Sequence, residues 1–511
     1  MRTIQSTRTL CVLILCNLLL ILSACGQKSE PVANVDEEAT AAKAAPAVAV
    51  KMPITTSSDE ARAEFDAGRA LLDNLHFTEA RPHFERVVEL DPGFAMGHLF
   101  MANTSTTTAS FIAAVEQAEA NAAGASAGEQ AMIEATAAAV RNDQEAQLEA
   151  LGKLVELHPQ DERSHNQLAN YFNGQQDYDQ AILHFGHAVT INPDFASAYN
   201  SLGYAQRADG NLDAAKDAFT RYIELIPDEA NPYDSYAELL MEMGNYDDAI
   251  QNYGKALEID SHFSGSYAGI SVAESLKGDS AAAQAAATGM LTAARTSGEK
   301  QGAMFRSITS HLFAGDGDAA IAVAEEIAAM NEAEGDYAAM GGITEYMGDI
   351  MLNGGDTDKA AEYYDAALAY RQQSSINDAN KAQAGRNHQF KSAITALVAE
   401  RQDAAAEIAA GYSAAVAESG TGFERRRVHE LSGYLAMVGE DYETAVAELA
   451  QGTQVNPIVL YWSAVANRAA GNNEAAADLA HRAATRNVLS GNAPFARADA
   501  LKLVDELAAG E

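Results

Sequence analysis

The sequence predicts an all-α fold, an α-solenoid of about eleven helical hairpins that ends in a C-terminal capping helix. Three observations predict it. A chain of 511 residues exceeds what one compact core normally holds, so repeats or several domains are expected. Columns of similar residues recur every 34 positions, the length of two antiparallel helices with their turns. Aromatic residues make up only 7% of the chain while alanine is abundant, which favours thin helices in close contact.

The first segment, residues 1–24, is predicted to be a signal peptide. Arg2 and Arg8 precede an apolar run from Leu10 to Leu22. A helix of that length spans only about 20 Å, which is too short for the apolar core of a bilayer. A basic start followed by a short apolar run is typical of a secretory signal.

The apolar run ends at Leu22-Ser23-Ala24-Cys25, which resembles the lipobox of bacterial lipoproteins. The resemblance implies cleavage before Cys25, lipid attachment to this residue, and anchoring of the protein to a membrane. Gly26 stands where an aspartate would imply retention in the inner membrane, so the expected location is the outer membrane of the cell envelope, facing the periplasm. An ordinary secretory signal with an incidental cysteine is the alternative.

Residues 25–58 are expected to comprise the lipidated cysteine and a flexible linker. Residues 26–58 are rich in Ala, Val, Pro, Glu and Lys, and they contain no aromatic residue and no apolar periodicity. A segment of this composition cannot bury enough apolar surface to form a core, which favours a tether.

The columns at 34-residue spacing define the hairpins from residue 59 onward. Small residues let two helices approach closely, and aromatic residues fill the space beside them. Glycine suits the left-handed backbone that closes a first helix, and proline ends a second helix because it lacks an amide donor. The columns contain Ala181, Ala215, Ala249 and Ala283; Phe185, Phe219 and Tyr253; Ala169, Gly203, Ala237 and Ser271; Gly210, Gly244 and Gly278; and Pro193 and Pro227.

These columns resemble the tetratricopeptide repeat (TPR), whose small, aromatic and proline positions follow in this order. An early copy at Gly68, Ala80, Phe84 and Pro92 and a late one at Gly433, Ala445, Leu449 and Pro457 fit equally well. The resemblance implies a right-handed solenoid of TPR-like hairpins that binds other proteins or extended peptides.

The resemblance varies along the chain, and we divide it accordingly. Residues 59–290 are predicted to form a TPR solenoid, with the best-matching repeats at 128–263. Residues 95–127 are degenerate, because the Thr-Ser run at 104–110 is expected to strain a regular helix. Residues 291–511 are predicted to form a divergent, alanine-rich TPR-like solenoid with extra residues between its hairpins, closed by a helix at Ala493–Leu507.

Charge and cysteine content exclude several kinds of function. The formal net charge is −38, which repels phosphate backbones, so nucleic acid is not expected as a partner. The three cysteines are Cys11, Cys16 and Cys25, so no disulfide or thiolate metal site is expected in the body of the protein.

A search for catalytic constellations finds none that is complete, so the chain is not expected to be an enzyme or to hold a cofactor. There is no phosphate-binding glycine loop, no nucleophile elbow and no dinucleotide fingerprint. His184 and His187 lie three residues apart and could share a metal ion, but without a visible third ligand they are better interpreted as solvent-facing. No metal site is therefore expected.

Candidate binding residues lie on the first helices of the hairpins, which line the groove in the solenoids that this chain resembles. One groove-facing column holds Asn166, Asn200 and Asp234, and an asparagine ladder can both donate to and accept from a peptide backbone. The neighbouring candidates are Asn170, Tyr204, Asn231 and Glu238. Ordinary surface polarity is the alternative interpretation of all seven.

The pattern as a whole indicates a membrane-anchored scaffold or adaptor that mediates protein–protein interaction in the cell envelope. The alternative is a lipoprotein that binds or sorts peptides or polysaccharide in an export or envelope-biogenesis system. These two functions share one fold, and fold alone does not separate them.

Overall fold

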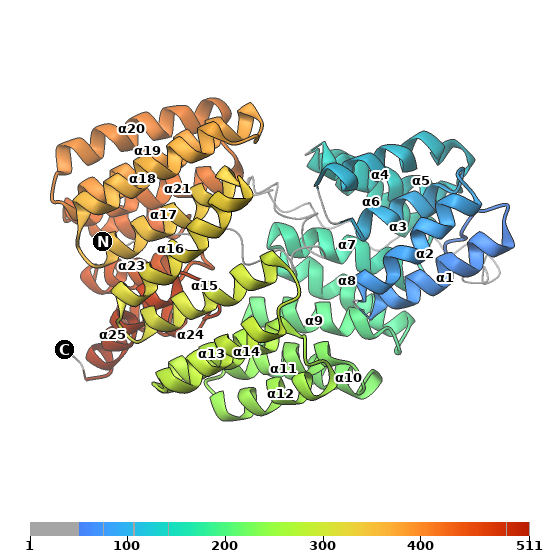
Figure 1. Ribbon diagram of the computed structural model, residues 1–511, viewed down its shortest axis with the longest axis horizontal. Coiled ribbons are helices and arrows are strands. Elements are labelled where there is room, and N and C mark those ends of the chain that lie inside the picture. Colours follow the sequence, from blue (N-terminus) through green and yellow to red (C-terminus); the bar gives the residue numbers. More distant parts are fainter. Residues whose placement is uncertain (1–50, 75, 106–107, 142, 487, 510–511) are drawn as a thin grey trace, which may run out of the picture. The chain divides into compact units, whose positions relative to one another are not determined.

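A computed structural model describes residues 51–74, 76–105, 108–141, 143–486 and 488–509 (Figure 1). These described residues form 25 α-helices and two short 3₁₀ turns, with no β-strand among them. The predicted signal peptide, Cys25 and the linker up to residue 50 lie outside the described residues. The all-α prediction is confirmed.

The described residues divide into two compact units, with the boundary between Ser235 and Tyr236 inside α11. The N-terminal unit (described residues 51–235) and the C-terminal unit (described residues 236–509) are built from consecutive helices that pair as hairpins. The domain limits expected from sequence composition remain predictions.

The N-terminal unit contains five complete hairpins and the first part of α11. Its helices are α1 (Asp59–Asp73), α2 (Phe77–Leu90), α3 (Ala95–Asn103), α4 (Thr108–Asn121), α5 (Ala127–Val140), α6 (Gln144–Leu157), α7 (Glu162–Gln175), α8 (Tyr178–Ile191), α9 (Ala196–Asp209), α10 (Leu212–Leu225) and α11 (Ala230–Glu242).

The C-terminal unit continues from within α11 to the capping helix. Its further helices are α12 (Tyr246–Ile259), α13 (Ser264–Lys277), α14 (Ser280–Ala293), α15 (Ser297–Phe313), α16 (Gly317–Glu334), α17 (Tyr337–Asn353), α18 (Thr357–Gln373), α19 (Asp378–Val398), α20 (Gln402–Ser419), α21 (Gly422–Val438), α22 (Tyr442–Leu449), α23 (Pro457–Ala469), α24 (Asn473–Thr485) and α25 (Arg497–Ala509).

The 34-residue period predicted from the sequence fixes where these helices begin. Successive second helices begin at Gln144, Tyr178, Leu212, Tyr246 and Ser280, each 34 residues after the last. The small-residue column is fully buried, and so is the aromatic column. A Cβ atom added to Gly203 would lie 2.7 Å from the Phe219 ring, so only glycine permits this approach of α9 and α10. Gly210 ends α9 with a φ of 92°, as the left-handed helix end requires.

Two regions differ from the sequence prediction. The stretch called degenerate, residues 95–127, contains a hairpin of α3 and α4, because α3 ends after nine residues and Thr104 and Ser105 lie in the turn. The 25 α-helices of the described residues make twelve consecutive pairs and the capping helix, in agreement with the expected number of about eleven hairpins. After residue 296, the extra residues lie within the helices rather than between them, since α15–α21 are 17 to 21 residues long.

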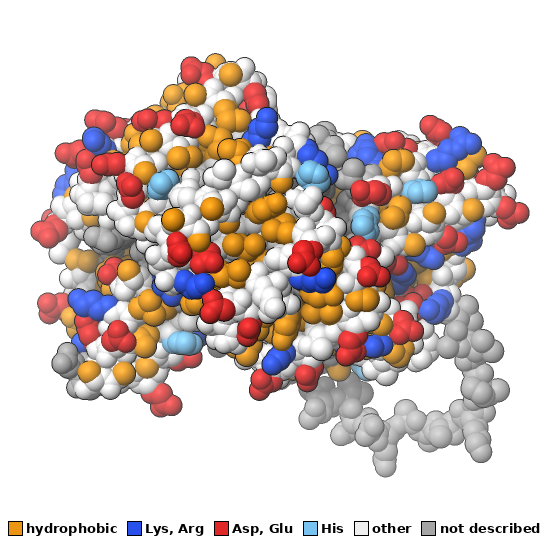
Figure 2. Space-filling view, turned by 60° about the horizontal axis from the view of Figure 1, so that its bottom comes forward, with side chains coloured by type: hydrophobic (Ala, Val, Ile, Leu, Met, Phe, Trp, Pro, Cys, Tyr) orange, Lys and Arg blue, Asp and Glu red, His pale blue; other side chains and the backbone are white. Residues whose placement is uncertain are grey.

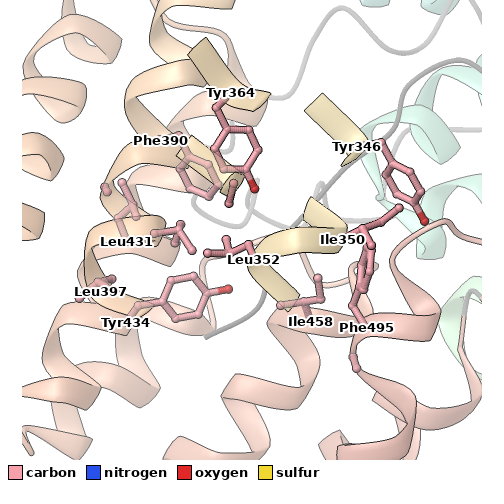
Figure 3. Close-up of a cluster of buried hydrophobic side chains, with 14 of the residues drawn as sticks. Tyr346, Ile350, Leu352, Tyr364, Phe390, Leu397, Leu431, Tyr434, Ile458 and Phe495 are labelled. Atoms are coloured by element: carbon pink, nitrogen blue, oxygen red, sulfur yellow. The ribbon is translucent and has the colours of Figure 1, made fainter. Parts of the chain in front are cut away.

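The chain closes as predicted, with a helix packed on the last hairpin. Ala493–Phe495 form a 3₁₀ turn, and α25 follows and packs against α24. In the C-terminal unit, the largest apolar cluster joins residues of α15–α23 to Phe495 (Figure 3). Tyr346, Tyr412 and Tyr434 are the largest of its rings that are shielded almost completely from solvent.

Residues 51–58 are not the free tether that the sequence predicted. They have no regular secondary structure, yet their exposure alternates residue by residue, and Met52 and Ile54 pack against the apolar cluster of α1–α6. Their polar contacts, described below, hold this segment against the N-terminal unit.

Candidate functional site

The first helices of the hairpins form an inner row, because they contact one another across neighbouring hairpins. In the N-terminal unit α3 contacts α5 and α7 contacts α9, and in the C-terminal unit α19 contacts α21 and α21 contacts α23. Elements that lie on the inside of a solenoid's curvature approach each other most closely. The predicted binding residues belong to three first helices, α7, α9 and α11.

Asn166 and Asn200 occupy the same position, the fifth residue, of α7 and α9. Both side chains are half-buried. The Oδ1 atom of each is shielded from solvent and has no hydrogen-bond partner among the described residues. A shielded acceptor without a donor costs free energy, so each amide gains if its oxygen turns towards an N–H or O–H group.

Asn170 and Tyr204 lie on the same two helices and are also half-buried. The Tyr204 ring contacts Phe219 edge-on at 5.1 Å between centroids, and the Arg207 guanidinium lies 4.8 Å from the Tyr204 ring centre. The Tyr204 hydroxyl donates to Ser235 Oγ at 3.2 Å. Tyr204 is therefore fixed in place by its own repeat and by Ser235 on α11 of the next.

Asn231 and Asp234 lie in the interior rather than on an open surface. Asn231 is 9% exposed, and its Oδ1 accepts hydrogen bonds from the Tyr222 hydroxyl at 3.1 Å and from Ser235 Oγ at 3.4 Å. Asp234 is 2% exposed. Glu238 is half-buried and lies on the part of α11 in the C-terminal unit. The structure thus places Asn166 and Asn200 in equivalent positions, whereas the third rung of the predicted ladder is buried.

The two histidines noted in the sequence lie in a cluster of three, because His165 on α7 joins His184 and His187 on α8. His165 Nδ1 lies 3.1 Å from His184 Nδ1, and His165 Nε2 lies 3.2 Å from the Pro159 carbonyl oxygen. Burial, with the neighbouring His165 and His187, lowers the pKa of His184 to about 4. His187 is exposed as expected, but His184 is not solvent-facing, since it stacks on Phe172.

A buried group of charges in the C-terminal unit escaped the sequence analysis. Lys391 on α19 is fully buried, with its Nζ 2.5 Å from Asp349 Oδ1 and 3.7 Å from Glu345 Oε1, both on α17. The Tyr364 hydroxyl donates to the same Asp349 oxygen at 2.7 Å. Burial lowers the pKa of Lys391 to about 7, although Glu345 opposes the shift. In the sequence, the signal for these buried charges was a lysine directly after Phe390, within an apolar stretch.

These charges hold α17, α18 and α19 together and enclose little free space. The ion pair links α17 to α19 and the Tyr364 hydroxyl links α18 to α17, both through Asp349 Oδ1, whereas Asp349 Oδ2 is shielded and has no partner among the described residues. No group of three His, Cys, Asp or Glu side chains is arranged to hold a metal ion in the described part of the chain. Among the described helices, none has the length and apolarity needed to cross a membrane.

The face of the molecule shown in Figure 2 is charged, but it carries no large patch of only acidic or only basic side chains. Acidic side chains are spread over this face, and basic side chains lie among them (Figure 2).

Comparison with known proteins agrees with the fold. Models of the tetratricopeptide repeat match residues 166–232 and 230–263. No curated protein sequence matches the chain.

Several solved structures resemble it. The crystal structure of MamA is 24% identical over 31% of this chain and 93% of its own, with a TM-score of 0.29. A TPR protein of Parabacteroides merdae is 13% identical over 50% of this chain and 97% of its own, with a TM-score of 0.38. The pilF structure from Pseudomonas aeruginosa is 16% identical over 48% of this chain and 96% of its own, with a TM-score of 0.29. None of these likenesses carries a functional inference. Residues 166–263 match the tetratricopeptide-repeat models, and the other described helices continue the same all-helical hairpin pattern.

Proposed function

We propose that this protein is a membrane-anchored scaffold that binds an extended segment of a partner protein along the inner row of the N-terminal unit. Tetratricopeptide repeats are protein-interaction modules, which supports the general function. The lipobox ending in Cys25 supports the anchor, and Gly26 after it supports the periplasmic face of the outer membrane. The net charge of −38 argues against nucleic acid as the partner.

The observation that carries the proposal is the pair of shielded, unpartnered oxygens of Asn166 and Asn200. They recur at one repeat period on adjacent helices of the inner row. An extended peptide presents backbone donors and acceptors whatever its side chains, so it can satisfy both amides at once.

The test is in-cell crosslinking with an Asn166→Ala/Asn200→Ala variant. Each lost hydrogen bond leaves a buried group of the partner unsatisfied and costs about 1–3 kcal/mol, enough to weaken capture about tenfold or more. We expect the yield of the crosslinked partner to fall accordingly while the circular dichroism spectrum stays unchanged.

A matched control replaces two asparagines on second helices, Asn121→Ala and Asn252→Ala. Their side chains donate to carbonyls of their own helices, Gln117 and Asp248. The control variant should capture the partner in wild-type yield. Equal partner yields from the Asn166→Ala/Asn200→Ala variant and the wild type would place the binding surface elsewhere.

A further inference from the structure

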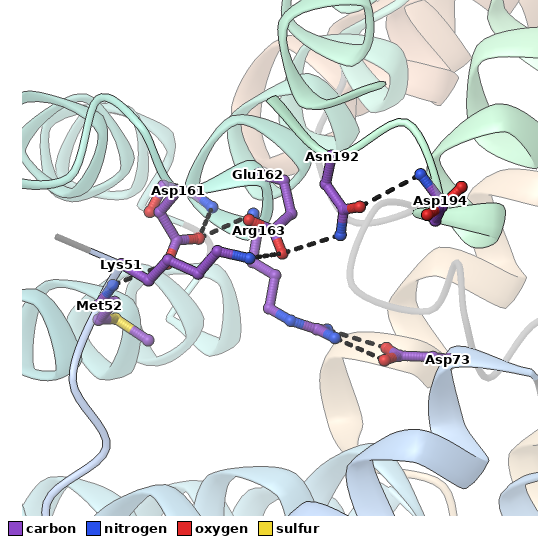
Figure 4. A network of polar contacts seen from close by, with 9 residues as sticks. Lys51, Met52, Asp73, Asp161, Glu162, Arg163, Asn192 and Asp194 are labelled. Carbon is purple, nitrogen blue, oxygen red and sulfur yellow. Dashed lines mark hydrogen bonds and ion pairs between the residues drawn. The ribbon is translucent and has the colours of Figure 1, made fainter. Parts of the chain in front are cut away.

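The segment 51–57, called the strap here, contacts residues before or at the starts of α7, α5 and α3. Figure 4 shows its N-terminal end, Lys51 and Met52, beside Asp161 and Glu162. Pro53 has no amide hydrogen, and a residue before proline, here Met52, is restricted to extended backbone. The even-numbered residues of the strap are half-buried and the odd-numbered ones exposed, the period of an extended chain lying on a surface. Its sequence thus favours the conformation in which it is held.

Carboxylates from three hairpin starts hold the strap, beginning at its N-terminal end. Lys51 Nζ lies 2.8 Å from Glu162 Oε1, and the Met52 amide donates to Asp161 Oδ2 at 2.7 Å. Asp161 also caps α7 through its other oxygen, which accepts from the amides of Arg163 and Ser164 (Figure 4).

Two further carboxylates, those of Glu129 and Asp91, accept hydrogen bonds from the C-terminal half of the strap. The Thr55 amide and hydroxyl each donate to Glu129 at 2.6 Å, one to each carboxylate oxygen. The Thr56 hydroxyl donates to Asp91 Oδ2 at 2.7 Å and is the main cause that lowers the pKa of Asp91. Asp91, Glu129 and the Asp161–Glu162 pair precede or begin α3, α5 and α7, so the row follows the repeat.

With the strap in place these carboxylates are shielded from solvent, and Glu129 Oε2 and Asp161 Oδ1 also accept amide hydrogens at the starts of their own helices. Glu129 is fully buried, Asp161 is 4% exposed and Glu162 is 5% exposed. Burying an ionised carboxylate is costly unless donors are supplied, and the strap supplies donors to all three. Glu162 Oε2 is also shielded and has no partner among the described residues, so the row can accept one more donor beside Lys51.

Gly128 makes room for the strap at α5. A Cβ atom added there would lie 3.1 Å from Met52 Cγ and 2.4 Å from His158 Nε2. The Arg62 guanidinium donates to the Ile54 carbonyl oxygen and fixes the middle of the strap. The strap is thus recognised through its backbone, two hydroxyls and one cation.

We propose that this carboxylate row is a binding site for an extended peptide that carries a basic residue followed by amide and hydroxyl donors, and that the strap is its resident intramolecular ligand. A tethered ligand acts at an effective concentration on the order of millimolar, so it excludes a free peptide of similar affinity. A peptide of this chemistry enters the row only when the strap is weakened. The inference is independent of the inner row formed by α7 and α9.

The first test is limited trypsin digestion of the full chain, with cleavage after Lys51 as the readout. In the wild type this bond should be protected. Asp161→Asn keeps the cap on α7, because asparagine caps helices as well as aspartate, but removes the acceptor for Met52. We expect cleavage after Lys51 to become about tenfold faster. Asp177→Asn, at the cap of α8 and away from the strap, is the matched control and should cleave at the wild-type rate.

The second test measures binding in trans by fluorescence anisotropy, with a labelled peptide of residues 48–58 as the probe. Full chain carrying Lys51→Glu and Thr55→Val should bind the peptide at least tenfold more tightly than the wild type, whose row is filled. Adding Glu129→Gln and Asp161→Asn should abolish that binding. If the double variant loses its helical signal, Thr55→Val alone replaces it.

Two results would overturn the proposal. One is the absence of saturable binding to a folded strap variant. The other is binding that persists at the same affinity after the Glu129 and Asp161 substitutions. A failure here leaves the crosslinking test at Asn166 and Asn200 unaffected, so the two hypotheses fail separately.

Discussion

At the residue scale, the histidine cluster at the seam of α7 and α8 gives the repeat region a defined response to pH. His184 is held between Phe172 and His165, with ring centroids 5.8 Å and 5.4 Å away. The cluster tolerates neutral rings, since one imidazole can donate to the next, but a charged His184 has no acidic partner among its ring contacts. Protonation therefore opposes folding at this seam.

The corresponding prediction concerns the pH range in which the seam loosens. Burial lowers the pKa of His184 from 6.5 to about 4, so the unfolded seam binds more protons than the folded one between these values. The contribution of His184 to stability is complete above pH 6.5 and is lost as the pH falls towards 4. The protection factors of amides in α7 and α8, which correct for the slower intrinsic exchange in acid, should fall over this range in the wild type, and less so in His184→Phe, which keeps a ring against Phe172.

His481→Gln, which removes an exposed histidine of α24, is the control for this experiment and should follow the wild-type pH profile. Identical profiles for His184→Phe and the wild type would show that His184 carries no part of the acid response.

At the scale of the helices, each hairpin depends on close approach at one small residue. In the N-terminal unit, Gly68 faces Phe84 and Gly203 faces Phe219. The same relation holds in the C-terminal unit between Gly348 and Tyr364 and between Gly433 and Leu449. Close contact between a glycine on the first helix and a large side chain on the second therefore stabilises hairpins that differ in helix length.

Gly203→Ala tests this rule. The added Cβ lies 2.7 Å from a fully buried ring, so α9 and α10 must separate, at a cost of about 1–3 kcal/mol. Gly186→Ala on α8 is the matched control, because nothing lies within 4 Å of the added atom. That substitution should stabilise its helix by about 0.5–1 kcal/mol. Urea denaturation midpoints that move in the same direction for both variants would contradict the rule.

The helices also show how much of the fold could be predicted from the sequence. The 34-residue columns located the helices of residues 144–293, because repeated packing leaves a repeated pattern of small and aromatic residues. The pattern did not reveal the hairpin at residues 95–121, since its short α3 carries almost no polar face. Nor did it place the extra residues of α15–α21, because a longer helix adds a turn without changing its contact residues.

Site residues were harder to predict, because burial and pairing depend on parts of the chain far apart in sequence. Repeat spacing placed Asn166 and Asn200 in register but could not indicate that Tyr222 would bury Asn231. The strap contacts of Lys51 and Thr55 span 111 and 74 residues, respectively, beyond the reach of any local pattern. His165, which joins His184, comes from the preceding helix.

At the scale of the whole molecule, the proposed functions lie on different parts of the chain. The strap and the pair Asn166 and Asn200 belong to the N-terminal unit, whereas the buried charges of Lys391 belong to the C-terminal unit. The proposed anchor at Cys25 precedes the strap by 25 residues, those numbered 26–50. With a net charge of −38, the body repels anionic lipid surfaces, so membrane association should depend on the lipid alone.

Cys25→Ser tests that dependence. Each buried methylene of an acyl chain contributes about 0.8 kcal/mol, so several chains hold a protein on a membrane, and a serine cannot form the thioether that carries them. We expect the variant either to appear in the soluble fraction or to keep its signal segment and migrate more slowly than the wild type. Cys16→Ser is the matched control, because Ile14 and Leu15 before it are too bulky for a lipobox, and it should fractionate as the wild type does. Cys25→Ser protein that remains with the outer membrane at wild-type mobility would contradict the anchor, and the acidic body would then need a protein partner to hold it there.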